Sequence, residues 1–301
     1  MSSPAPDVSV VIDTETQVPS HRISLRDSLD AWRKQTSRNR VLEYLVVAPR
    51  PATAGETELL QGLPARWIER PGLRYYDMKN EGIRMSRGRY VALADSDARL
   101  AEDWVERALE TLETGDPRLA LVTGRTRYLE GPFSRELAIA QLPHQSDAGS
   151  DTHHFLAHNV LFRGDILRAR LFRGGHIRLS PDADLASRLL EDGYRLRYEP
   201  ALAATHNYAG GWRELWMHCE VIGYHDARYR AFVNERVPGT LRNAAGRFRV
   251  LLRRLFELQD PTGIPRRRLP LSILFLAGYC AAVGRGFARG RKGRPEPFAQ
   301  F

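Results

Sequence analysis

The sequence predicts an α/β fold in which a mainly parallel sheet is flanked by helices and followed by a C-terminal helical extension. Short apolar runs alternate with helical segments from residue 8 to about residue 208, a pattern typical of parallel sheets with covered faces. One of these runs, residues 90–94, ends in acidic residues, as expected at the sheet edge where α/β proteins bind ligands. From residue 211 basic, amphipathic helices follow one another without strands. We therefore expect two domains, residues 1–210 and 211–301.

Composition limits the function without naming it. The chain has 301 residues, of which 43% are hydrophobic and 27% charged, so it is long enough and apolar enough to form a substantial core. Its net charge of +9 comes almost entirely from arginine, because only Lys34, Lys79 and Lys292 are lysines. This excess is consistent with a biased codon usage, although arginine also suits phosphate recognition. The charge alone is compatible with nucleic acid, anionic lipid or a nucleotide-linked substrate.

Cysteine usage and the N-terminus indicate a cytoplasmic protein. The two cysteines, Cys219 and Cys280, form neither a disulfide framework nor a Cys-x-x-Cys metal site. Residues 1–7 lack the basic start and apolar core of a signal peptide.

The first half of the chain alternates predicted strands and helices. Residues 8–12 are a β-branched run ending at a polar cluster, and Ser24 is placed to cap a helix with Leu25, Leu29 and Trp32 on one face. The next expected elements are strands at 41–48 and 65–68, a helix over 75–87, a strand at 90–94, a helix over 102–114 and a strand at 119–123.

An acidic tip ends the strand at 90–94. Alternate residues of an extended segment point the same way, so Asp95 and Asp97 are expected to converge on one hard cation while Ser96 faces elsewhere. Such a cation would hold a diphosphate. The alternative is that Asp-Ser-Asp is only a turn followed by a helix cap, since Asp favours both positions.

The second half continues the pattern and then changes. The polar, turn-rich segment 131–151 is expected to be a mobile segment over the site. A strand that turns into a short helix is predicted at 158–165, and the acidic stretch 180–185 opens a helix that ends at Gly193. Strands are expected at 194–198 and 201–205, followed by His206.

Residues 269–284 are the most apolar stretch of the helical extension, which also contains helices at 212–232 and 241–258. At about 16 residues it is shorter than the roughly 20 that a membrane-spanning helix needs. Arginines flank it on both sides, which suits a helix lying at an anionic membrane surface. The alternative is a core helix with solvated basic ends.

Three motifs in the same order resemble inverting glycosyltransferase family 2, which has the GT-A (Rossmann-like) fold. The strongest is Asn-Glu-Gly-Ile at 80–83 followed by Gly-Arg-Tyr, an apolar strand and Asp-Ser-Asp at 88–97. The second is Asp-Ala-Asp-Leu at 182–185 with Gly193-Tyr194 and His206, and the third is the segment 159–165. The resemblance covers about residues 8–208.

This resemblance implies a metal-dependent enzyme that transfers a sugar from a nucleotide-sugar donor, in expectation UDP-linked, to a glycan, lipid-linked or small-molecule acceptor. It assigns Asp182 as the catalytic base and places Asn159 and Asp184 on the acceptor side. The metal, Mn²⁺ or Mg²⁺, is assigned to Asp97, Asp95 and His206. The residues expected to bind the donor are Thr14, Glu15, Lys79, Asn80, Asp95, Ser96 and Asp97.

The chain also departs from the family pattern. Asp13-Thr14 stands where family members usually carry Pro-Thr, Ala48-Pro49 replaces the acidic residues that hold the base, and Pro181 stands where Glu is common. The Gln-x-x-Arg-Trp signature of processive synthases is absent from the sequence, which favours transfer of one sugar at a time.

Three other functions are weighed against this one. A nucleotidyltransferase would carry a Gly-rich phosphate loop after the first strand, and residues 13–16 contain no glycine. A degenerate relative that only binds sugar nucleotide or scaffolds a membrane assembly is the main alternative, because Ala48 and Pro181 would fit loss of activity. Nucleic-acid binding is favoured by charge alone, since no aromatic-basic strand motif is present, and is not expected.

Overall fold

The computed structural model describes residues 5–15, 22–113, 116–173, 181–207, 211–233 and 239–295, without the side chains of 259–261. The chain forms two compact units. The first, here called the sheet unit, comprises Met1–Thr126, Ala148–His176 and Pro181–Asn207. The second, the helical unit, comprises Arg127–Asp147, Ile177–Ser180 and Tyr208–Phe301. The helical unit thus includes a segment from the middle of the sequence, which lay inside the first of the two expected domains.

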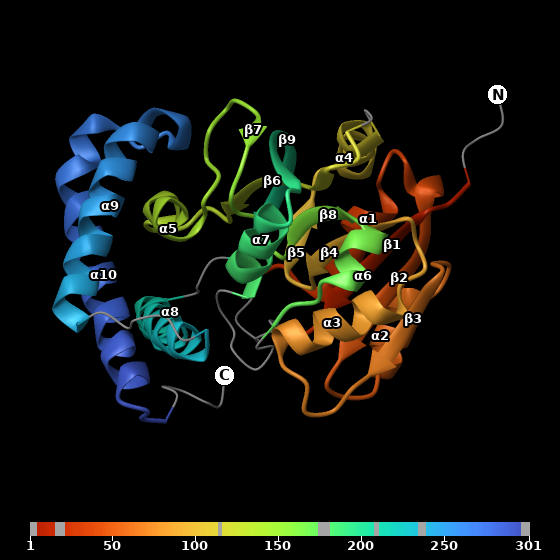
Figure 1. Cartoon of the computed structure of the whole chain (residues 1–301), viewed down its shortest axis with the longest axis horizontal. Coiled ribbons are helices and arrows are strands. Elements are labelled where there is room, and N and C mark those ends of the chain that lie inside the picture. The colour runs from red at the N-terminus through yellow and green to blue at the C-terminus, as the bar shows by residue number, and fades with distance from the viewer. Residues whose placement is uncertain are drawn as a thin grey trace. The chain divides into compact units, whose positions relative to one another are not determined.

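One sheet, with strand order β3-β2-β1-β4-β8-β6-β9-β5 and β7 paired to β9, organises the sheet unit (Figure 1). Its strands are β1 (Val8–Asp13), β2 (Val41–Ala48), β3 (Ala65–Glu69), β4 (Tyr90–Asp95), β5 (Ala98–Leu100), β6 (Leu119–Tyr128), β7 (Ser150–Asp151), β8 (Asn159–Arg163) and β9 (Arg195–His206). Its helices are α1 (Leu25–Arg33), η1 (Arg38–Arg40), α2 (Ala54–Leu60), α3 (Tyr75–Met85), α4 (Trp104–Glu113), α6 (Gly164–Ala169) and α7 (Pro181–Glu191).

The α/β class is confirmed, and the sheet is mixed. Strands β3, β2, β1 and β4 run parallel to one another. Strand β8 is antiparallel to both β4 and β6, and β5 and β7 are each antiparallel to β9. The parallel half therefore corresponds to the part of the sequence in which apolar runs and helices alternate most regularly.

Two hydrophobic cores lie on opposite faces of this sheet because successive side chains of a strand point to opposite sides. Val10 and Ile12 of β1 contribute to one core, which also contains apolar residues of α1 and α4. Val11 contributes to the other, with residues of α3, α6 and α7. Helices therefore cover both faces of the buried strands, so a functional site is expected at the strand ends.

Close packing fixes α3 against β1. A Cβ atom added to Gly82 would lie 2.3 Å from Cγ1 of Val11, so only glycine allows α3 to approach the strand this closely. At the end of β1, Asp13 is directly paired with Asp95 at the end of β4. The first turns of α3 thereby reach the place where the two strands end.

Several expected elements need correction. Residues 131–151 are not simply a mobile segment, because they contain α5 (Ser134–Gln141), which belongs to the helical unit. The strands expected at 194–198 and 201–205 are one strand, β9, which passes through Pro200. Pro200 lacks the N–H donor, but its fixed φ is compatible with an extended strand.

The helical unit contains α5, α8 (Trp212–Phe232), α9 (Thr240–Thr262), η2 (Arg266–Arg268) and α10 (Leu269–Arg291). A single core joins them, with Leu137, Leu215, Leu255, Leu276 and Val283 among its buried residues. Helix α10 has 23 residues and reaches Arg291. The apolar run predicted it only to residue 284, because arginines continue a helix without adding to its apolar pattern.

Glycines let α8 and α10 pack in close contact. A Cβ atom added to Gly286 of α10 would lie 1.8 Å from the carbonyl oxygen of Glu220, and one added to Gly223 of α8 would lie 1.8 Å from that of Val283. The backbones of the two helices therefore touch at two points.

By length and composition, residues Arg266–Arg291 would suffice to cross a membrane, with a mean hydropathy of 1.5. Half of the most apolar stretch is buried inside the structure.

Candidate active site

A buried lysine joins the ends of β1 and β4. The Nζ atom of Lys79 lies 2.8 Å from carboxylate oxygens of both Asp13 and Asp95 and donates to the carbonyl of Ala94 at 3.1 Å. The lysine and Asp13 side chains are fully buried. Burial favours the neutral amine, but the two carboxylates outweigh this effect and raise the pKa of Lys79. Lys79 therefore lies inside the site, paired with its carboxylates, and is neither a solvated helix lysine nor an exposed contact for a diphosphate.

Two consecutive tyrosines at the start of α3 connect the site to α7. The Tyr75 hydroxyl donates to the Asp95 carboxylate at 2.9 Å, and the Tyr76 hydroxyl is hydrogen-bonded to the Asp182 carboxylate. Their rings pack edge to face with centroids 4.7 Å apart. One turn of helix thus orients two acidic side chains that lie 87 residues apart in the sequence.

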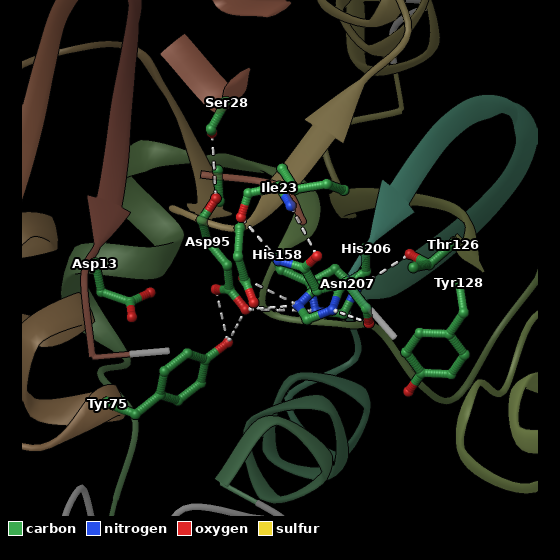
Figure 2. A network of polar contacts seen from close by, with 12 residues as sticks. Asp13, Ile23, Ser28, Tyr75, Asp95, Thr126, Tyr128, His158, His206 and Asn207 are labelled. Atoms are coloured by element: carbon green, nitrogen blue, oxygen red, sulfur yellow. Dashed lines mark hydrogen bonds and ion pairs between the residues drawn. The ribbon is translucent and has the colours of Figure 1, made fainter. Parts of the chain in front are cut away.

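Two histidines face the acidic tip of β4 (Figure 2). The Nε2 atom of His206, the last residue of β9, lies 3.3 Å from Asp97 and 3.4 Å from Asp95, while its Nδ1 faces the carbonyl of Asn207. His158, just before β8, places Nδ1 3.8 Å from Asp95 and Nε2 3.1 Å from the Thr126 hydroxyl. The expected convergence of Asp95 and Asp97 on one point is therefore present, with His206 beside it.

The two imidazoles differ in protonation. Burial opposes the charged form of His206, but Asp97 and Asp95 outweigh it and raise its pKa to about 9. Burial and the charge of His206 lower the pKa of His158 to about 3. His158 is therefore neutral and carries a lone pair on one ring nitrogen, as a metal ligand requires.

These side chains fit a divalent cation. One ligand atom each from Asp95, His158 and His206 lie within 4.8 Å of one another. Asp97 adds a second carboxylate within reach of the same His206 nitrogen. Two carboxylates and two imidazoles offer oxygen and nitrogen ligands for a divalent cation, and His206, whose pKa is raised to about 9, would lose its proton on binding one.

The predicted base lies at the start of α7. Asp182 is half-buried, and its carboxylate accepts from the backbone N–H of Ala183 at 2.9 Å. Burial raises its pKa to about 6 against these hydrogen bonds. A carboxylate with this pKa is ionised at neutral pH and basic enough to accept a proton.

Three predicted site residues have structural partners instead. Asn80 donates from its amide nitrogen to the Phe172 carbonyl at 2.9 Å and accepts from the Phe172 N–H at 3.0 Å. Asn159, expected on the acceptor side, is fully buried in the sheet, where it accepts from Trp104 and donates to Leu202. Asp184 is paired with Arg173 and Arg188, which stabilises the first turns of α7.

Three further predicted donor residues lie near the cluster. Ser96 is buried, and its backbone N–H donates to the Asp13 carbonyl at 3.1 Å. Thr14 follows β1 and donates its N–H to Val47, and Glu15 lies 3.5 Å from Arg74. Their roles toward a donor stay predictions.

The sequence reasoning missed Asp13, Tyr75, Tyr76 and His158 as members of the site. In the sequence, Asp13 stands out only as a departure from the family's Pro. His158 directly precedes the segment 159–165, so its position before a predicted strand is a usable signal. The sequence carries no signal that places Tyr75 and Tyr76 in the site, because aromatic residues at a helix start are usually core residues.

Comparisons with known proteins agree with this geometry. Residues 24–171 match the family model described as Glycosyl transferase family 2. No curated protein matches the sequence significantly.

Solved structures with the same fold are glycosyltransferases. The mannosyltransferase PcManGT from Pyrobaculum calidifontis, in complex with GDP-Man and Mn²⁺, matches with a TM-score of 0.63 and 16% identity, over 97% of this chain and 89% of its own. Residues 1–349 of S. aureus TarS, in complex with UDP-GlcNAc, match with a TM-score of 0.55 and 13% identity, over 96% and 92%. GalNAc-T7 with UDP, GalNAc and Mn²⁺ matches with a TM-score of 0.55 and 11% identity, over 76% and 51%. The chain therefore matches glycosyltransferase family 2 over residues 24–171 and has the fold of solved glycosyltransferases.

Proposed function

We propose that this protein is a metal-dependent, inverting glycosyltransferase that moves one sugar from a nucleotide-sugar donor to an acceptor hydroxyl. The observation that carries the proposal is the cluster of Asp95, Asp97, His158 and His206 at the ends of β4 and β9, with Asp182 held by the neighbouring Tyr76. The family match and the nucleotide-sugar complexes of the similar structures support it.

The metal, Mn²⁺ or Mg²⁺, is proposed to be held by Asp97, Asp95 and the two histidines. When bound, the cation neutralises the charge that develops on the leaving diphosphate. Lys79, paired on both sides, keeps the Asp95 carboxylate ionised and fixed for this task.

Asp182 is proposed to draw the proton from the acceptor hydroxyl as that oxygen attacks the anomeric carbon. Attack on the face opposite the leaving diphosphate inverts the configuration. Removal of the proton becomes favourable only as the new bond forms, so a carboxylate of moderate basicity suffices.

The donor sugar and its base are open to experiment. The similar structures bind GDP-Man in one case and UDP-GlcNAc in another. We propose a UDP-linked donor, in line with the family resemblance, although Ala48 and Pro49 offer no acidic contact to the base. The acceptor is proposed to be a glycan, a lipid-linked intermediate or a small molecule.

A donor panel tests the proposal. The purified protein is incubated with UDP-, GDP- and dTDP-sugars and Mn²⁺, and release of free nucleotide is followed with and without EDTA. We expect metal-dependent release from one class of donor, lost in Asp97→Ala. Donor binding without release under all conditions, with or without added glycan acceptors, would instead favour a non-catalytic relative that only binds sugar nucleotide.

A further inference from the structure

The exposed side of α10 changes character along the helix axis. Leu271 and Leu274 are 49% and 67% exposed, and Ala277 and Ala281 continue this exposed stripe. Residues spaced three and four apart lie on one side of a helix, so Arg285 and Lys292 extend the same stripe toward the C-terminal end. The stripe is therefore apolar over its first turns and cationic over its last.

The opposite side of α10 is already occupied. Leu276, Val283 and Phe287 are buried, and Gly286 and Gly290 lie in backbone contact with α8. The helix is thus anchored in its own unit by one face, so the other remains free to contact a partner.

Basic residues surround a hollow at the cationic end. Its volume is about 210 Å³, and the described residues that line it are Arg285, Ala288, Arg289, Lys292 and Arg294. Arg285 is paired with the buried Glu220 at 3.1 Å, and the other three cations add positive charge around the same space. A concave group of cations of this size is complementary to a phosphate group.

Exposed apolar side chains are concentrated in the same unit. Among the described residues of the chain, all large hydrophobic side chains that are exposed belong to the helical unit. They are Trp212, Trp216, Phe232, Leu241, Val250, Phe256, Leu271 and Leu274. Leu271 and Leu274 of this set lie on the stripe of α10.

We propose that this stripe of α10, residues 271–292, docks the protein on an anionic membrane surface. Leu271 and Leu274 enter the boundary between headgroups and acyl chains, and the basic hollow receives a lipid phosphate. The two halves of the stripe match the two layers that a membrane presents, apolar acyl chains and anionic headgroups. The proposal is independent of the transfer chemistry in the sheet unit, and it would bring the enzyme to the inner face of the cell membrane.

Flotation of the full-length protein with vesicles tests the proposal. We expect binding to vesicles of phosphatidylcholine with 30% phosphatidylglycerol, weak binding to phosphatidylcholine alone, and release as salt increases, because the headgroup contacts are screened. Each basic residue near an anionic surface contributes about 1 kcal/mol, so Arg289→Gln/Lys292→Gln should weaken binding roughly 30-fold. Leu274→Asp should weaken it at least about 10-fold, because a charge replaces a leucine that enters the membrane in the proposed complex.

Matched controls separate this surface from general charge and apolarity. Lys34→Gln/Arg38→Gln removes two exposed cations from the sheet unit, and Leu241→Asp replaces an exposed leucine of α9. Both should bind like wild type, and circular dichroism should show that all variants are folded.

Three results would overturn the proposal. One is equal binding of wild type and Leu274→Asp, which would show that the apolar half of the stripe does not enter the membrane. The second is equal loss in the control variants. The third is suppression of vesicle binding by millimolar inorganic phosphate at constant ionic strength, with flotation unaffected by the lipid charge, which would indicate a site for free phosphate.

Discussion

Asp95 is the residue at which the site's interactions meet. Its carboxylate contacts Lys79, Tyr75 and His206, and its backbone carbonyl accepts from Ser28 at 3.3 Å. Burial works against ionisation, but Lys79 and the histidines lower the pKa of Asp95 well below its usual range. The side chain is therefore ionised and fixed before any ligand arrives.

Replacing Lys79 tests how strongly the stability of the fold depends on its two ion pairs. Lys79→Met leaves the buried carboxylates of Asp13 and Asp95 without their cation, so we expect unfolding free energy to fall by about 3–5 kcal/mol. Asp13→Asn in the Lys79→Met background should recover part of the loss. Urea denaturation measures both, with the exposed Lys34→Met as control. Wild-type stability in Lys79→Met would show that the ion pairs contribute nothing.

Asp182→Asn should lower turnover by about 10² or more while donor affinity stays near that of wild type, because it keeps the shape and removes the base. Asp184→Asn is the matched control, since Asp184 is occupied by two arginines. Loss of turnover in Asp184→Asn with normal turnover in Asp182→Asn would move the base two residues along.

The assignment of Asp182 as the base predicts how turnover depends on pH. With its pKa raised to about 6, Asp182 is protonated and inactive as a base below that pH and ionised above it. Turnover at saturating donor should therefore rise with pH through about 6 and reach a plateau near neutrality. A stopped assay across pH 4.5–8 measures this limb, and a profile that is flat from pH 4.5 to 7 would contradict the role.

Among single residues, the sequence could place those that lie at the end of a strand. Asp95, Asp97 and His206 lie together because their strands end at one edge of the sheet. Asn80 and Asn159 matched family positions equally well, yet their amides are used by neighbouring backbone and side chains. Motif position places a residue near the site, but its hydrogen-bond partners come from segments far apart in the sequence.

Among the elements, those with a strong apolar period and local caps could be predicted. Ser24 caps α1 and accepts from the Asp27 N–H, and α8 has the bounds Trp212–Phe232 that its pattern indicated. The antiparallel pairing of β8 and the place of α5 could not be predicted from the sequence, because both depend on contacts between distant segments.

The α8–α10 contact gives a matched test of element packing. Gly286→Ala places a methyl group 1.8 Å from a backbone oxygen, so we expect a loss of about 1–3 kcal/mol in stability. Gly278→Ala on the same helix meets nothing within 4 Å and should be neutral or stabilising, since alanine favours helix. Thermal unfolding compares the two, and equal effects would contradict close packing at Gly286.

At the scale of the whole molecule, the two units differ in the groups that could bind ligands or partners. The sheet unit holds the buried ionised cluster, and the helical unit holds the exposed apolar side chains and the basic hollow. Part of the positive charge behind the net +9 lies in one place, because arginines and a lysine gather at the end of α10.

The central claim is that the acidic tip of β4 forms a metal-dependent nucleotide-sugar site, and titration calorimetry of the donor in Mn²⁺ tests it most directly. We expect donor binding by wild type and by the exposed control Asp192→Asn, and loss of binding in EDTA and in Asp97→Ala, which removes one of the two carboxylate ligands proposed for the cation. Donor binding in Asp97→Ala that is as tight as in wild type and insensitive to EDTA would contradict the account.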